Sequence, residues 1–446
     1  MSYFGKSNDT GSYTPASREL QFQEFSPQSS SYDSNIMFKF MSNAVQQWVP
    51  AQSYLAVKIK VTKADGTSPL ATTRFRPEHV NEYAANRLFN RMSHTANGVR
   101  VASNEQPARY VDGWADAHSA RDANESHNEV FNKAAWTQSQ DTHATRTHVT
   151  VCMRPQLALW DLPYGIVTGE NVLQLIPKSK ALFSAIVFNA DNLAAAAGST
   201  LPDARFLKLG TAAGADTAAA TVVDVSAYTA NACNLAAGTG ATPLFSIESI
   251  RLYCAFATPQ VPMQLGPLMT HRLTTPNIQE IALATGSTML SSTLTVPSST
   301  YFVQLYIIDD TNDHSASKGP VSFATAGLKD IQIRLAGTNY PTIPYTALNG
   351  TQDNDIVRAY ADTCNSRNRL DMDSSYPKSL EAFARAPVMN FNIYRAQDDN
   401  DTQLQIRASM TGTTATKLIV VCYYNEILGL TYDRQDLVRV DLQPVV

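Results

Sequence analysis

The sequence predicts an all-β protein of the sandwich or jelly-roll type. The chain of 446 residues is long enough for two large β domains. Many short apolar segments are separated by connections rich in Gly, Pro, Ser and Asn, which is typical of sandwiches and jelly rolls. Only 17% of the residues are charged, against about 25% in an average protein. The surface is therefore polar but weakly charged, as expected of a protein whose faces are covered by neighbours.

The overall charge and the ends of the chain exclude some classes of function. The net charge is −4, so a strongly basic nucleic-acid binder is excluded, because neutralising phosphates requires a surplus of Lys and Arg. No run of about 18 apolar residues occurs, so we expect no transmembrane helix. The first 25 residues lack the layout of a signal peptide. The five cysteines form no CxxC pair, and we expect reduced, mostly buried thiols.

The first 33 residues are rich in Ser, Gln, Tyr and Asp and show no periodicity. We expect residues 1–33 to form a flexible N-terminal arm that orders against a partner. β patterns begin at Ile36. The segment Tyr54–Thr62 alternates strictly, with Leu55, Val57, Ile59 and Val61 on one face, which predicts a half-buried strand.

Further strands are expected along the whole chain. In 247–256, the apolar residues Ile250, Leu252, Cys254 and Phe256 would share the inner face. The remaining candidates are 147–154, 172–176, 182–188, 301–308, 331–335, 388–393, 403–410 and 417–424.

Two segments have helical spacing instead. In 77–92, Val80, Tyr83, Ala84, Leu88 and Met92 recur at helical intervals after Pro77. In 353–364, Ile356, Val357, Tyr360, Ala361 and Cys364 do so behind Asp353, a residue that caps helices well. One helix falls in each half of the chain, which favours two similar β units, although the sequence shows no repeat. The Ala-, Gly- and Thr-rich stretch 190–243 is expected to be a large insertion at the surface or a mobile loop.

No enzyme motif is present. The sequence lacks GxSxG, HExxH, GxxxxGK[ST] and GxGxxG. A polar stretch places His118 and His127 among Asp116, Asp122 and Glu125, where a metal site or an acid–base pair is one interpretation and a solvated loop the favoured one. Two acidic loops have calcium-like oxygen ligands, namely Asp309, Asp310, Asn312 and Asp313, and Asp398, Asp399, Asn400 and Asp401. Asp and Asn turns explain both loops, so we expect no catalytic residues, no metal site and no cofactor.

Several segments together resemble a known family. Tyr54–Gly66 resembles an early strand of the double jelly-roll major capsid proteins of polinton-like viruses, adintoviruses and virophages. The stretch from Val80-Asn81 through Leu88-Phe89 to Asn97–Val101 resembles the segment that follows. In the second half, similar segments are Val303–Asp310, Ile331–Gly337 followed by Pro341, Asp355–Tyr360 and Lys417–Tyr424. They occur in the family's order and span about residues 35–445.

The resemblance implies two tandem eight-stranded jelly rolls. The expected division is the arm 1–33, a first jelly roll at 34–257 that carries the 190–243 insertion, and a second at 258–446. It also implies a non-enzymatic major capsid protein that forms homotrimers shaped as pseudo-hexameric capsomers and builds the icosahedral shell of a double-stranded DNA virus.

The implied partners are neighbouring capsomers, penton proteins and minor capsid proteins, with no sequence-specific nucleic acid. An internal membrane or the genome beneath the shell stays open as a further partner. The implied location is the virion, after assembly in the host nucleus or cytoplasm. The alternatives are a single jelly-roll or penton-type viral protein, which would have one sandwich, and a carbohydrate-binding β-sandwich protein, which would need an aromatic-lined groove or a calcium site.

Overall fold

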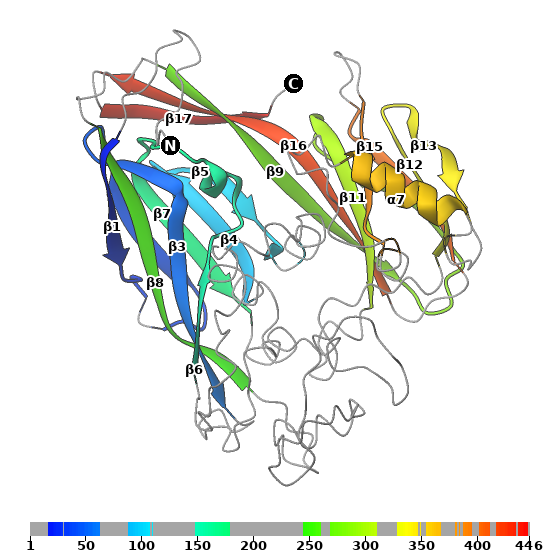
Figure 1. The fold of residues 1–446 in the computed structure, drawn as a ribbon, viewed down its shortest axis with the longest axis horizontal. Helices are drawn as coiled ribbons and strands as arrows, with labels where there is room; N and C mark the ends of the chain where they lie inside the picture. The colour runs from blue at the N-terminus through cyan, green and yellow to red at the C-terminus, as the bar shows by residue number, and fades with distance from the viewer. Residues whose placement is uncertain are drawn as a thin grey trace.

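The computed structural model describes the strands of two β-sandwiches that lie beside each other (Figure 1). The described residues are 17–29, 31–62, 88–107, 109, 148–178, 244–259, 268–309, 328–346, 348, 354–366, 380, 383, 387–394, 401–410, 416–433 and 436–444. Within these residues, no helix is long and apolar enough to cross a membrane.

In the described residues, the first sandwich contains eight strands and a short 3-10 helix. Its elements are β1 (Ser17–Phe25), β2 (Ile36–Ser42), β3 (Gln47–Thr62), β4 (Phe89–Ala96), β5 (Val99–Asn104), β6 (His148–Met153), η2 (Ala158–Asp161), β7 (Gly169–Pro177) and β8 (Leu244–Pro259). One sheet has the order β1-β8-β3-β6 and the other has the order β2-β7-β4-β5. All the pairings are antiparallel.

The second sandwich repeats this order strand for strand. Its elements are β9 (Leu268–Leu283), β10 (Met289–Thr295), β11 (Thr300–Asp309), β12 (Leu328–Leu335), β13 (Thr338–Tyr345), α7 (Asn354–Ser366), β14 (Met389–Asn392), β15 (Gln403–Met410) and β16 (Thr416–Asp433), followed by β17 (Asp436–Pro444). Strands β9, β16, β11 and β14 form one sheet, and β10, β15, β12 and β13 form the other.

In each sandwich, therefore, the first, eighth, third and sixth strands form one sheet and the second, seventh, fourth and fifth form the other. This is the jelly-roll arrangement, in which long connections alternate between the two sheets. The predicted fold of two tandem eight-stranded jelly rolls is confirmed. Strand β17 is an addition that pairs with the end of β16.

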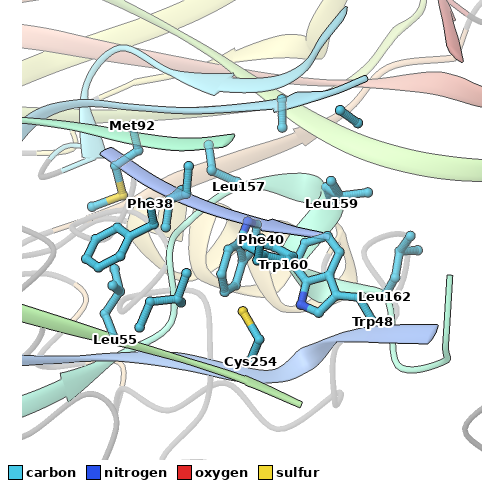
Figure 2. Packing of buried hydrophobic residues seen from close by; sticks show 14 of the residues in the cluster. Phe38, Phe40, Trp48, Leu55, Met92, Leu157, Leu159, Trp160, Leu162 and Cys254 are labelled. Atoms are coloured by element: carbon cyan, nitrogen blue, oxygen red, sulfur yellow. The ribbon is translucent and has the colours of Figure 1, made fainter. Parts of the chain in front are cut away.

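The strands that sequence periodicity predicts have the predicted faces. Leu55, Val57 and Ile59 of β3 are at most 1% exposed. On β8, Ile250, Leu252, Cys254 and Phe256 point into the same core. Figure 2 shows Leu55 and Cys254 directed into the core that also contains Phe38, Phe40 and Trp48. Burial of alternate residues explains why these segments are strands.

The core of the first sandwich is completed by residues from the second half of the chain. Met269 and Leu273 of β9, Leu428 and Leu430 of β16, and Val440 of β17 belong to the same buried cluster as the first sandwich. In Figure 1 these three strands extend from the second sandwich across the top of the first. The first hydrophobic core thus draws on residues from both sides of position 258.

Two segments differ from the sequence-based expectation. Within the expected arm, Ser17–Phe25 is strand β1, paired along its length with β8. Its Glu and Gln residues concealed it, since polar side chains suit an edge strand. Within the expected helix 77–92, Phe89–Met92 belongs to β4 and pairs with β7. A short apolar segment fits either period, and pairing with β7 decides between them.

The helix expected at 353–364 is present as α7, at Asn354–Ser366. Several other predicted features fall outside the described residues. They are Asp353, residues 77–87 of the first helix, the strand candidate 182–188 and the insertion 190–243.

Candidate functional site at the junction of the two sandwiches

The acidic and histidine-rich segments give no chemical site among the described residues. His118, His127, Asp116, Asp122 and Glu125 lie outside them, as do Asp310, Asn312, Asp313, Asp398, Asp399 and Asn400. Asp401 accepts a hydrogen bond from the backbone N–H of Gln403 at 2.8 Å, which is the turn expected there. Within the same residues, no group of His, Cys, Asp and Glu is placed to hold a metal ion.

Four cysteines lie among the described residues, and each has its sulfur as a thiol. Cys254 and Cys422 are buried, whereas Cys152 and Cys364 are half-buried. Burial raises the pKa of the Cys254 thiol well above its usual range, so this group stays protonated and unreactive. The prediction of reduced thiols agrees for these four residues, and Cys233 lies outside the described part.

The sheet that contains β11 and β16 is apolar on both faces. One face packs into the second sandwich's own core through Val303, Leu305, Leu418 and Val420. The outer face is buried as well, and its members are Phe302, Tyr306, Ile308, Val388, Ile419, Val421 and Tyr423. A strand buried on both faces has a nearly continuous apolar sequence, and β16 has one.

Arg109 of the first sandwich is held against this outer face. It follows β5 closely, and its side chain is 7% exposed. Its guanidinium Nε lies 2.9 Å from Glu280 Oε1, and the Tyr306 hydroxyl donates to its backbone carbonyl at 2.5 Å. Lys417 Nζ is 3.5 Å from the other oxygen of Glu280. One carboxylate thus compensates two cations at the point where the sandwiches meet.

A second contact ties the strands above the first sandwich to it. The Tyr432 hydroxyl of β16 donates to the carbonyl of Val167 at 2.6 Å, within a buried environment. On β9, His271 Nδ1 is 3.1 Å from the Tyr164 hydroxyl. Burial lowers the pKa of His271 to about 4, so it is neutral at pH 7. The two sandwiches are therefore joined by uncharged contacts at Tyr432 and His271 and by an ion pair between Arg109 and Glu280.

The centre of the first sandwich holds a hydrogen-bonded histidine. His94 is fully buried, and its Nε2 lies 3.0 Å from Asn171 Oδ1. The Trp160 indole donates to His94 Nδ1 at 3.3 Å. Burial lowers the pKa of His94 to about 4, because the charged ring would lose its hydration. This polar group is satisfied within the core and is not open to a ligand.

The junction residues were missed by sequence reasoning. Arg109 and Glu280 are 171 residues apart, and Tyr306 and Arg109 are 197 apart. The signal was indirect: Tyr306 and Lys417 lie on the predicted strands 301–308 and 417–424, which are apolar on both faces apart from Gln304 and Lys417 itself. Periodicity identifies such strands but does not reveal their partners.

No family model matches the chain, and no curated protein matches it in sequence. Solved structures match it over nearly its whole length. A chain in the structure of the Sputnik virophage has a TM-score of 0.52 at 12% identity, covering 97% of this chain and 91% of that one. The capsid of the virus PBCV-1 matches with a TM-score of 0.52 at 8% identity, covering 96% and 98%.

The Faustovirus major capsid protein is similar to the same degree. Its TM-score is 0.52 at 10% identity, and the match covers 96% of this chain and 92% of that one. At such low identity the similarity establishes the architecture and not the function. The chain therefore has the double jelly-roll fold of viral major capsid proteins.

Proposed function

We propose that the protein is a major capsid protein of a double-stranded DNA virus. Three copies assemble into a trimer with a pseudo-hexameric outline, and these capsomers tile an icosahedral shell. The protein acts by assembly and not by catalysis. Its place is the virion, and its partners are neighbouring capsomers, penton proteins and minor capsid proteins. Assembly takes place in the host nucleus or cytoplasm.

The observation that carries the proposal is the strand-for-strand equivalence of the two sandwiches. Two equivalent units in one chain make a three-fold assembly of six units approximate a hexagon, which is a shape that tiles a surface. The junction at Arg109, Glu280 and Tyr306 supports this function, because a tile needs its two units in a fixed relation. Similarity to the PBCV-1 capsid and the Faustovirus major capsid protein along 96% of the chain supports it further.

The alternatives are weaker. A single jelly-roll or penton-type protein would have one sandwich, whereas this chain has two with the same strand order. A carbohydrate-binding protein needs an aromatic groove or a calcium site, and within the described part of the chain no group of His, Cys, Asp and Glu is placed to hold a metal ion. The low fraction of charged residues, 17%, supports extensive contact between subunits.

The test is the mass and shape of the purified full-length protein. Light scattering coupled to size-exclusion chromatography should give three times the chain mass of 48.7 kDa. Negative-stain images should show three-fold particles with a hexagonal base. A protein that stays monomeric up to high concentration, with no three-fold particles, would contradict the proposal.

A further inference from the structure

The two sandwiches share a constellation of side chains that the sequence does not reveal. In the second sandwich, Glu280 of β9, Ile419 of β16 and Tyr306 of β11 lie in one row across three paired strands. In the first sandwich, Glu24 of β1, Tyr253 of β8 and Tyr54 of β3 form the same row. The strands are the first, eighth and third of each unit.

A basic residue completes the constellation at the same position in both units. Lys417 precedes Ile419 by two residues on β16, and its Nζ lies 3.5 Å from Glu280. Arg251 precedes Tyr253 by two residues on β8, and its Nε lies 3.6 Å from Glu24. Two residues before each Glu stands an apolar side chain, Ile278 in one unit and Phe22 in the other. Each unit therefore carries a Glu, a cation, a Tyr and an apolar residue on the outer face of the corresponding sheet.

The two constellations differ in what covers them. In the second unit, Tyr306 and Ile419 are fully buried, and Glu280 and Tyr306 hold Arg109 from the first unit of the same chain. In the first unit, Phe22 is 51% exposed. The side chains of Glu24 and Arg251 are 49% and 45% exposed. The same surface is an internal contact in one unit and faces outward in the other.

The outward constellation has the composition of a protein interface. The rings of Phe22 and Tyr54 are 6.3 Å apart, and those of Tyr54 and Tyr253 are stacked at 5.1 Å. The Tyr253 hydroxyl donates to Glu24 at 3.1 Å. An aromatic centre with a charged rim is the usual anatomy of an interface, in which Tyr and Arg supply much of the binding energy.

We propose that this aromatic face, defined by Phe22, Glu24, Tyr54, Arg251 and Tyr253, binds the second sandwich of another copy of the chain. The proposal rests on the proposed trimer and specifies which faces meet in it. Within the chain, the second unit's constellation binds the segment that follows the fifth strand of the first unit, where Arg109 lies. We infer that the same contact is repeated between chains. The aromatic face of one copy then binds the segment that follows β13, the fifth strand of the second sandwich, in a neighbouring copy.

That segment has a matching apolar surface. The fifth strand of the second sandwich is β13, and α7 follows it. Ile343 of β13 is 68% exposed and Val357 of α7 is 48% exposed. Arg358 holds the two elements together by donating to the carbonyls of Ile343 and Pro344 at 3.1 and 2.7 Å. Arg358 is also paired with Asp355 at 3.6 Å, so this surface offers its two exposed aliphatic side chains, which complement the rings of the aromatic face.

The contact joins two different surfaces, so each copy has one of each to offer. A heterologous contact generates a closed ring when the rotation between neighbouring copies divides a full turn evenly. In the proposed trimer, three copies with two sandwiches each form such a ring of six units. The free edge of β13 does not favour strand addition, because Pro341 and Pro344 interrupt it and Arg358 binds its carbonyls. The contact is therefore made by side chains.

The test compares three substitutions that each place an arginine at an exposed apolar position. Phe22→Arg alters the aromatic face and Val357→Arg alters α7. Met41→Arg, at a side chain that is 60% exposed on β2, is the matched control outside both surfaces. Size-exclusion chromatography with light scattering, run as a dilution series, measures the trimer fraction. Thermal unfolding and circular dichroism check that each variant is folded. If Phe22→Arg does not fold, Phe22→Ser replaces it in the same dilution series.

We expect Phe22→Arg and Val357→Arg to raise the concentration at half-dissociation by at least about tenfold, since each buries an unpaired charge in the contact. Met41→Arg should dissociate as the unaltered protein does. Trimers that survive both substitutions would overturn the assignment of faces and leave the proposed function standing. A control that dissociates equally would also overturn the assignment. An unaltered protein that never trimerises would overturn both proposals.

Discussion

The indole ring of Trp48 lies parallel to the imidazole ring of His94, with ring centroids 5.1 Å apart and planes 5° apart. Both side chains are fully buried, and Figure 2 shows Trp48 close to Trp160 and Phe40 in the same core. Phe40 contacts the His94 ring edge-on at 6.1 Å, and Asn171 bonds its Nε2. These contacts on His94 are uncharged, so a proton added to the ring would have no countercharge among them.

The first prediction is that the protein loses stability in mild acid because of His94. The pKa of His94 is about 4 in the folded protein and 6.5 unfolded, so the unfolded chain binds the additional proton between these values. The neutral His94 ring makes its full contribution to the free energy of unfolding above pH 6.5. This contribution is lost as the pH falls toward 4. Between pH 7 and pH 4.5 the loss should be about 2 kcal/mol.

The measurement is urea unfolding at pH 7, 5.5 and 4.5 with His94→Gln for comparison. His271 titrates in the same range and stays in both proteins, so the difference between the two curves isolates His94. The variant should be less stable at pH 7 and should have the weaker pH dependence. Identical slopes in the two proteins would show that His94 does not titrate in this window.

The second prediction concerns the ion pair at the junction. Arg109→Ala should lower the free energy of unfolding by about 2 kcal/mol, because Glu280 loses its nearest cation in a largely buried place. This decrease in the free energy of unfolding is smaller than the one expected for an isolated buried ion pair, because Lys417 remains near Glu280.

Arg439→Ala is the control for this experiment. The Arg439 side chain is 69% exposed, and its Nε lies 2.8 Å from Asp441 Oδ1. An exposed pair of this kind contributes little, so the control should change stability by less than about 0.5 kcal/mol. Equal effects of the two substitutions in urea unfolding would contradict the importance of the junction.

How far the sequence predicts this fold depends on the strength of each strand's apolar pattern, which is weak in several edge strands. The central strands β3, β8 and β16 were recognised, because they are flanked on both sides and have strong apolar patterns. The strands that were missed include the edge strands β1, β9, β10 and β13. The edge strands β6 and β14 were recognised from their apolar patterns, whereas part of the central strand β4 was expected to be helical. Edge strands tolerate Pro and polar residues, as Pro276 in β9 and Pro341 in β13 illustrate.

The candidate site was less predictable than the fold. Arg109 and Glu24 look like ordinary surface charges in the sequence, and their roles depend on register across several strands. The equivalence of Glu24 and Glu280 is likewise carried by strand pairing, since the surrounding sequences differ. Packing and register create these relationships, and local patterns do not encode them.

The third prediction is that a residue of the second half stabilises the first sandwich. Leu430 of β16 is fully buried in the first core, so Leu430→Ala should cost about 2 to 5 kcal/mol. Hydrogen exchange followed by mass spectrometry should show faster exchange in β5 and η2, the parts of the first sandwich that contact β9 and β17 beside Leu430. Leu404→Ala, at a fully buried position in the second core, should instead speed exchange in β10 and β12. Faster exchange confined to the second sandwich in Leu430→Ala would refute the shared core.

The fourth prediction arises from the turns that join the fourth and fifth strands of each sandwich. Asn97 and Gly98 have φ values of 46° and 82°, and Ala336 and Gly337 have φ values of 57° and 72°. Two successive left-handed residues form the hairpin turn that favours Asn-Gly. Alanine is strained in this region, whereas asparagine tolerates it. Ala336→Asn should therefore stabilise the protein by about 0.5 to 1 kcal/mol, measured by thermal unfolding.

The reciprocal substitution provides the control. Asn97→Ala places alanine in the equivalent turn of the first sandwich and should destabilise the protein by a similar amount. If both substitutions lowered the melting temperature, contacts of the side chains would outweigh the backbone preference. Opposite signs would establish that the left-handed backbone of this turn, present in both units, determines which residue is favoured there.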